Sequence, residues 1–291
     1  MHRHAAPSGP QHEEETIIST SRSSPRCGGL RRITIAALAA FLAVGLASGV
    51  RIAAPPAAGQ SDTTGDRVMQ ATLMEANQRT GEVSTAELKQ ILAAKSAYVF
   101  DARPPLEYAI SHIPGALNVA LKPGTPTSLY ISDVAEIGRL VPGTDAPIVL
   151  YCNGPFCGKS KRLSEELLDA GYTNVRRYQL GAPTWRALVG VMQIELEALR
   201  YVMDGDQTAV WFDARSAEAF QAGRIAGARN LERADVTKAK DDGRLPMEDH
   251  NTRIIVFGAQ ARAVAEEIAK NAFHNVAYFD GEIERLQTAL P

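Results

Sequence analysis

A two-domain α/β fold is predicted by an alternation of short apolar strands with helical patterns and by an internal repeat. The apolar run at 148–151 is a predicted buried strand, and the segment 160–170 that follows it has helical periodicity. Such alternation favours a parallel sheet that helices cover on both faces. The sequence Phe-Asp-Ala-Arg at 100–103 recurs at 212–215, 112 positions further on. The sequence therefore predicts that one α/β unit occurs twice.

The repeat extends through most of both units. Residues 112–118 match 224–230 at the same offset, and the later matches keep the same order with different gaps. Those later matches are 148–151 with 254–257, and 170–175 with 271–276. A unit of about 100–110 residues is longer than a solenoid repeat and indicates duplicated domains. We predict the domains at 82–190 and 191–291.

The elements of the first unit follow from local patterns. A capping box at 84–87 starts a helix over 88–92. A turn or short helix is expected from Tyr108 to Gly115, and further helices at 134–140 and 160–170. The predicted strands are 97–100, 118–120, 148–151 and 174–178. In parallel sheets, ligands bind beyond the carboxyl ends of the strands, and Cys152 directly follows one such end.

The N-terminal region differs in composition from the rest. Residues 1–32 are polar and are predicted to be a disordered cytoplasmic tail, and 51–81 a linker. The uncharged run 33–50 reaches the lower length limit for spanning a bilayer. Arginines precede it, which predicts a single-pass inner-membrane anchor with the domains on the periplasmic or extracellular side. A signal peptide cleaved near Ala47 or Ala58, giving a secreted protein, is the alternative.

The composition excludes several classes of function. The net charge is −2 and no basic run is interleaved with aromatic residues, so a nucleic-acid partner is not expected. Three cysteines do not make a disulfide framework, and the six histidines lack metal-ligand spacing. We therefore expect no metal and no cofactor. The oligomeric state is not predictable from these features.

The segment 152–162 carries the strongest chemical signal. Cys152 ends a buried strand, and a loop containing Gly154, Pro155 and Gly158 leads into a helix. Converging N–H groups and a helix N-terminus favour a thiolate, as do the basic residues Lys159, Lys161 and Arg162. A purely structural core cysteine is the alternative interpretation.

Several segments together resemble the rhodanese (sulfurtransferase) family in its tandem two-domain form. Asp101-Ala102-Arg103, followed by Glu107-Tyr108 and then 111–116, is similar to the first family signature. Tyr151-Cys152 with its glycine-containing loop is similar to the active loop. Residues 171–175, 180–181 and Trp185 are similar to the closing pattern. The resemblance covers roughly residues 82–291 and implies two small parallel-sheet domains.

The resemblance implies transfer of sulfane sulfur from a donor such as thiosulfate to a thiophilic acceptor through a cysteine persulfide. The implied partners are a small sulfur-containing anion and a thiol acceptor. Asp101, Arg103 and His112 are expected to support the structure and not to act on sulfur. The expected substrate-binding residues of the active loop are Asn153, Gly154, Phe156, Gly158, Lys159, Ser160 and Arg162.

The sequence departs from the family pattern in its active loop. The loop contains two extra positions and a second cysteine, Cys157. Cys152 is preferred as the nucleophile because it keeps the strand-end position, and its pKa is expected to be low. Cys157 is the alternative nucleophile or a resolving thiol. A longer loop also suits a larger anion, so a cysteine-dependent phosphatase or arsenate reductase stays open, although Lys159 stands where such enzymes have an arginine.

The C-terminal unit contains no cysteine, and Gly258 stands at the position equivalent to Cys152. Sulfur transfer there is not expected, so we predict a non-catalytic partner domain. A third hypothesis is a sulfur- or redox-sensing binding module that presents the two loop cysteines to a partner.

Overall fold

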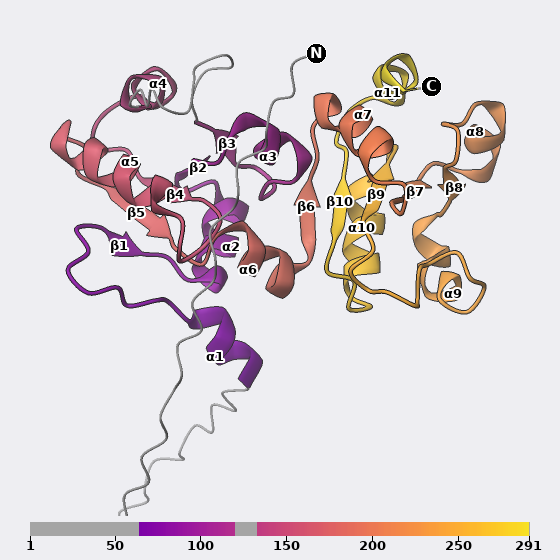
Figure 1. Cartoon of the computed structure of the whole chain (residues 1–291), viewed down its shortest axis with the longest axis horizontal. Coiled ribbons are helices and arrows are strands. Elements are labelled where there is room, and N and C mark those ends of the chain that lie inside the picture. The colour runs from indigo at the N-terminus through magenta and orange to yellow at the C-terminus, as the bar shows by residue number, and fades with distance from the viewer. Residues whose placement is uncertain (1–63, 120–132, 291) are drawn as a thin grey trace, which may run out of the picture. The chain divides into compact units, whose positions relative to one another are not determined.

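The computed structural model describes residues 64–119 and 133–290, which form two five-stranded sheets with equivalent strand orders (Figure 1). The first sheet has the order β1-β5-β4-β2-β3 and the second β6-β10-β9-β7-β8. Every strand pairing described in these sheets is parallel. The predicted duplication of a parallel α/β unit is confirmed.

The first sheet has the strands β1 (Gly81–Glu82), β2 (Tyr98–Asp101), β3 (Leu117–Asn118), β4 (Ile148–Tyr151) and β5 (Val175–Tyr178). Its helices are α2 (Thr85–Ala94), α3 (Pro105–Ile110), α4 (Val134–Leu140), α5 (Gly158–Asp169) and α6 (Gly181–Val189), after the preceding α1 (Thr64–Gln70). The capping box is present, since the backbone N–H of Glu87 donates to Ser84 Oγ at 3.2 Å.

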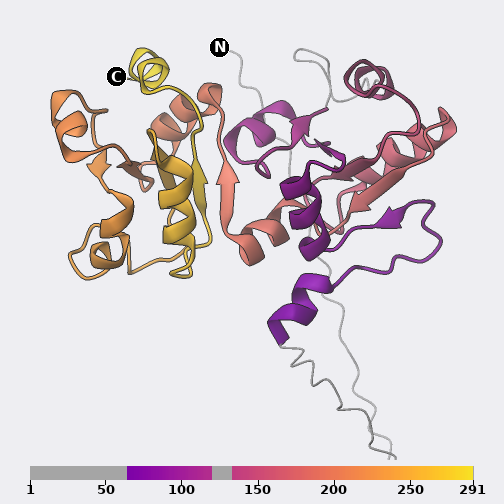
Figure 2. The same cartoon turned by 180° about the vertical axis from the view of Figure 1, so that it is seen from behind.

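The second sheet has the strands β6 (Val191–Gln193), β7 (Val210–Asp213), β8 (Arg229–Asn230), β9 (Ile254–Phe257) and β10 (Val276–Tyr278). Its helices are α7 (Leu196–Gly205), α8 (Ala217–Ala222), α9 (Val236–Ala239), α10 (Ala261–Ala269) and α11 (Ile283–Ala289). Helix α10 packs on β9 and β10, as α5 packs on β4 and β5 (Figure 1, Figure 2).

Side-chain alternation along β4 decides which residues face which helices. Val149 and Tyr151 are buried in the cluster that includes α2 and α6, whereas Ile148 and Leu150 join the cluster of α4 and α5. Because successive strand residues point to opposite faces, the next residue, Cys152, continues the second set and is buried with it. This alternation places the Cys152 side chain under α5.

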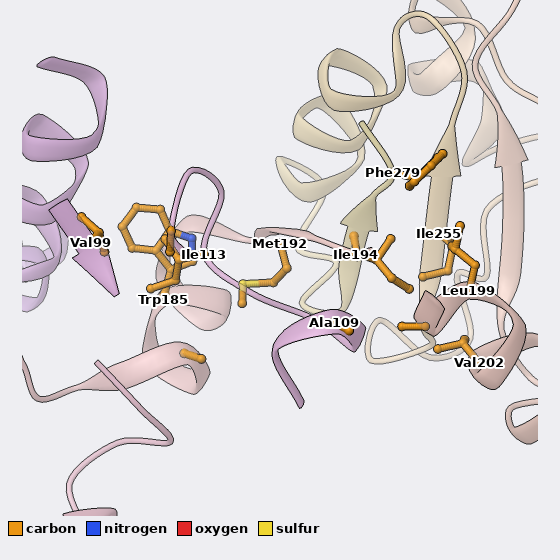
Figure 3. Packing of buried hydrophobic residues seen from close by; sticks show 14 of the residues in the cluster. Val99, Ala109, Ile113, Trp185, Met192, Ile194, Leu199, Val202, Ile255 and Phe279 are labelled. Carbon is orange, nitrogen blue, oxygen red and sulfur yellow. The ribbon is translucent and has the colours of Figure 1, made fainter. Parts of the chain in front are cut away.

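The two sheets lie in one compact unit and share one hydrophobic cluster. Figure 3 shows members from both, among them Val99 and Trp185 with Leu199 and Ile255. Burial of each large apolar side chain contributes about 1.5–3 kcal/mol. Packing against the second sheet therefore stabilises the first sheet.

His112 joins the two sheets through its backbone. Its N–H donates to Gln193 O at 2.9 Å, and Gln193 N–H donates back to His112 O at 2.9 Å. The ring is 1% exposed, stacks on Tyr108 and places Nδ1 3.0 Å from Tyr108 O. Burial lowers the pKa of His112 to about 4, so its 3.4 Å approach to Glu195 joins a neutral ring to a carboxyl.

We expect this histidine to make stability depend on pH. Between about pH 6.5 and about pH 4 the unfolded chain takes up a proton that buried His112 does not. The free energy of unfolding should therefore fall through this window, by an amount on the order of 3 kcal/mol. Urea denaturation of the wild type and His112→Gln at pH 7 and pH 4.5 checks this. The wild type should lose more stability than the variant, and equal losses would contradict the assignment.

The predicted membrane anchor needs correction. No helix within 64–119 or 133–290 has the length and apolar character needed to cross a membrane. The inner-membrane location inferred from the sequence is thus unsupported. The apolar run 33–50 itself, the predicted tail and Cys27 lie outside the described residues.

Several elements differ from the sequence predictions. Strand β1 was not predicted, and α3 begins at Pro105, before the expected start at Tyr108. Helix α5 starts at Gly158 and not at Ser160, because Cys157 already has the extended conformation of an N-cap residue. Helix α6 was not predicted, since Gly181 and Pro183 are typical of loops. Proline is tolerated in the first turn of a helix, where its missing N–H leaves no intrahelical bond unmade.

Candidate functional site

The cysteine loop lies at the carboxyl end of the first sheet. Strand β4 is flanked by β2 and β5, and the chain leaves it at Cys152 and enters α5 at Gly158. The carboxyl edge of a parallel sheet is where ligands bind in this class of fold. The loop is therefore placed where the sequence predicted a site.

Cys152 lies beneath this loop. It is 1% exposed, its Sγ donates to Cys157 O at 3.2 Å, and Ser160 Oγ donates to its Sγ at 3.6 Å. Burial, followed by the neighbouring Cys157 side chain, raises the pKa of Cys152 to about 11. The expected lowering of this pKa is wrong, because burial of the side chain outweighs the hydrogen bonds that the N–H and hydroxyl of Ser160 donate to the sulfur. Cys152 is a thiol at neutral pH.

Cys157 occupies the position that favours a thiolate. It is the N-cap residue of α5 and is only partly buried. Burial alone would favour the thiol, but the neighbouring Cys152 side chain and hydrogen bonds from the backbone N–H groups of Asn153 and Lys159 favour the thiolate. These bonds and the Lys159 charge hold the pKa of Cys157 below its ordinary value.

The other loop residues predicted to bind substrate have different environments. The Asn153 side chain is exposed and its amide donates to Glu107 Oε2 at 2.5 Å. Gly154 is buried, with a φ of +100° that a side chain would strain. Phe156 is fully exposed at the crest of the loop.

The first turns of α5 divide between the two cysteines. Gly158, Lys159 and Arg162 are exposed. Ser160 is buried, and its hydroxyl points to the Cys152 sulfur at 3.6 Å. The start of the helix therefore donates the Lys159 N–H to Cys157, and both the N–H and the hydroxyl of Ser160 to Cys152.

Asp101 and Arg103 form a closed pair beside the loop. Arg103 Nε lies 3.0 Å from both carboxylate oxygens of Asp101, and its Nη2 also donates to Ser111 O at 2.6 Å. Both side chains are buried, and the guanidinium lies over the Tyr151 ring. The Tyr151 hydroxyl in turn accepts the Ile113 N–H at 3.1 Å. These bonds tie β2, β4 and the chain after α3 together.

Gly181 is a residue whose role the sequence analysis missed. Its φ is +69°, and a Cβ there would lie 2.4 Å from Cys152 O and 2.3 Å from Gly154 N. The next N–H, of Ala182, donates to Cys152 O at 2.9 Å. The start of α6 thus holds the base of the cysteine loop. The signal available in the sequence was the Leu180-Gly181 pair of the closing pattern, which follows the last predicted strand of the unit.

Gly181→Ala is expected to displace the loop. The new Cβ meets backbone atoms that cannot move independently, and the left-handed backbone adds strain of about 1–3 kcal/mol. We expect a lower thermal midpoint and alkylation of Cys152 at neutral pH, where the wild type protects it. Gly171→Ala is the matched control, because Gly171 also has a positive φ but its Cβ would meet nothing within 4 Å. Protection of Cys152 unchanged in Gly181→Ala would contradict this role.

A cavity of about 230 Å³ opens beside the loop. Asn153 and Glu107 line it together with three arginines, Arg103, Arg186 and Arg253. Asp101 pairs with Arg103 and Asp206 with Arg253, but no carboxylate within the described residues pairs with Arg186. Burial, then repulsion from Arg253 and Arg103, lowers the pKa of Arg186. The positive charge of the arginines that line the cavity favours binding of a small anion.

The equivalent loop of the second sheet differs in more than its missing cysteine. Gly258 follows β9 with a φ of +95°, and a Cβ there would lie 2.9 Å from Arg215 Cγ. A thiol at this position would be strained.

In the described part of the chain, no three His, Cys, Asp or Glu side chains are grouped so that they could hold a metal ion.

Comparison with known proteins is consistent with this architecture. The Rhodanese-like domain model matches residues 84–188 and again 196–289. An HTH-type transcriptional regulator of Mycobacterium tuberculosis is 33% identical over 104 residues, which is 36% of this chain and 41% of the regulator. The chain thus spans less than half the length of that curated relative.

The solved structures that are similar to this chain include two of low sequence identity. A thiosulfate sulfurtransferase from Pseudomonas aeruginosa is 22% identical, with a TM-score of 0.30 over 70% of this chain and 43% of that one. A 3-mercaptopyruvate sulfotransferase from Escherichia coli is 19% identical, with a TM-score of 0.29 over 69% of this chain and 98% of that one. The two matches to the domain model cover more than half of the sequence, and the chain belongs to the rhodanese-like domain family, of which it contains two copies.

Proposed function

We propose that the protein is a sulfurtransferase whose nucleophile is Cys157. Its thiolate attacks the outer sulfur of a donor such as thiosulfate, the S–S bond of the donor breaks, and sulfite leaves with the bonding electron pair. The product is a persulfide on Cys157. A thiophilic acceptor then takes the outer sulfur and regenerates the thiolate.

The environment of the Cys157 sulfur carries this proposal. It is partly exposed, accepts two backbone N–H groups and lies at the N-terminus of α5, all of which favour an anionic sulfur. Cys152 has the strand-end position but a buried sulfur with a raised pKa. These observations favour Cys157 over Cys152 as the nucleophile.

The same groups suit the intermediate. The outer sulfur of a persulfide is anionic, and the N–H groups of Asn153 and Lys159 with the Lys159 ammonium favour negative charge there. The neighbouring cavity, with Arg186 unpaired by carboxylates of the described chain, can receive an anionic donor or the leaving sulfite. The second domain, without any cysteine, contributes Arg253 to this cavity and is proposed to be non-catalytic.

Incubation with thiosulfate tests the proposal. We expect sulfite release in proportion to protein, and intact mass spectrometry should show the gain of one sulfur atom. Hydrolysis of an aryl phosphate without sulfur gain would favour the phosphatase alternative. Neither reaction, with reversible loss of two hydrogens on oxidation, would favour a redox-sensing module. Either result would overturn the sulfurtransferase assignment.

A further inference from the structure

The two cysteines of the loop differ in solvent exposure and in the direction of their pKa shifts. Cys152 Sγ lies 3.2 Å from Cys157 O, so the two cysteines are direct neighbours, and neither is joined in a disulfide. Cys152 lies on the core side and is 1% exposed, whereas Cys157 is reachable from solvent. A sulfur donor therefore reaches Cys157 and not Cys152.

We propose that Cys152 resolves the Cys157 persulfide and releases hydrosulfide, giving the protein a second, self-contained half-reaction. This inference rests on the proposed sulfur loading of Cys157. The arriving sulfur is expected on the solvent side of Cys157 Sγ, with Cys152 Sγ behind it. This is the in-line arrangement that displacement at a disulfide-type sulfur requires.

The step balances without an external oxidant. The Cys152 thiol passes its proton to the departing sulfur, and its electron pair forms a bond to Cys157 Sγ. The bond between Cys157 Sγ and the outer sulfur breaks, and that sulfur leaves as hydrosulfide. The persulfide is thereby reduced to hydrosulfide while the Cys152 thiol is oxidised to the Cys152–Cys157 disulfide. A dithiol reductant returns the loop to its starting state.

The environment of Cys152 makes this step slower than transfer to a good acceptor. Burial of its sulfur outweighs the Ser160 hydrogen bonds that favour the anion, so a thiolate is scarce, and the attack depends on thiolate fraction. An external thiol at high concentration therefore takes the sulfur first. Hydrosulfide release then becomes the outcome when no acceptor is present.

A single-turnover experiment on the full chain tests the inference. All proteins carry Cys27→Ser, which leaves only the two loop cysteines. They are loaded with limiting thiosulfate, freed of excess donor and incubated without acceptor. The protein that carries only Cys27→Ser should first gain one sulfur atom. It should then release that sulfur as stoichiometric hydrosulfide, and its final mass should be two hydrogens lower than at the start. Dithiothreitol should restore the original mass.

Two variants separate the steps. With Cys152→Ser, the sulfur should be gained but retained, with hydrosulfide release lost. Cys152→Ala should behave in the same way, which guards against an effect of the serine hydroxyl. A persulfide that is equally long-lived with and without Cys152 would overturn the inference, as would sulfur found on Cys152. Failure of the first protein to gain sulfur at all would instead reject the proposed sulfurtransferase function.

Discussion

Cys157→Ser is expected to abolish sulfur loading. The serine hydroxyl is not ionised at neutral pH, so the N–H groups of Asn153 and Lys159 have no anionic nucleophile to stabilise. Loss of a covalent nucleophile lowers turnover by about 10³-fold or more. Sulfite release from thiosulfate, measured at saturating donor, is the readout.

Cys152→Ser is the matched comparison, because both variants remove one sulfur from the same loop. It should still release sulfite in the first turnover. Circular dichroism and the thermal midpoint should show that both variants are folded. Loading that survives in Cys157→Ser and disappears in Cys152→Ser would reverse the two roles and restore the preference drawn from the sequence.

Asp101→Asn is expected to have the largest effect on stability. Asp101 is fully buried and neutralises Arg103, whose side chain is only 7% exposed. Removing the carboxylate leaves a buried positive charge, which costs about 3–5 kcal/mol. That is a large part of the total stability of a typical domain, which is about 5–15 kcal/mol. Chemical denaturation should show a markedly lower midpoint.

The duplicated domain supplies the control for this prediction. Asp213 and Arg215 make the same bonds as Asp101 and Arg103, but the Arg215 side chain is 15% exposed. Water can solvate the orphaned guanidinium there more readily, so Asp213→Asn should cost less. An equal or larger loss of stability from Asp213→Asn would show that burial of the arginine does not set the cost.

Local patterns predicted the fold well because strands and helices of this sheet depend on short-range periodicity. The apolar run of β4 and the helical face of α5 are visible in the sequence, and the repeat defined two domains. The start of α6 was missed because it depends on contact between residues far apart in the chain. Gly181 approaches Cys152 O only after β4, α5 and β5 have formed.

The sequence located the cysteine loop, but the nucleophile that we propose is the other of its two cysteines. A strand-end cysteine next to glycines and lysines predicted a low pKa for Cys152. Strand alternation instead turns this side chain toward α5, and the two extra loop positions bring Cys157 to the helix N-cap. Charge and composition could predict that the loop stabilises a thiolate. Which of the two cysteine sulfurs is stabilised depends on the path of the backbone, which local sequence does not show.

The position of the transferred sulfur tests the central claim most directly. The Cys27→Ser, Cys152→Ser protein and the Cys27→Ser protein are loaded with thiosulfate, and the persulfide is trapped at once with an alkylating reagent. Tandem mass spectrometry of the loop peptide then locates the extra sulfur. The account predicts it on Cys157 in both proteins. Extra sulfur on Cys152 in the Cys27→Ser protein, with none gained by the protein that lacks Cys152, would contradict it.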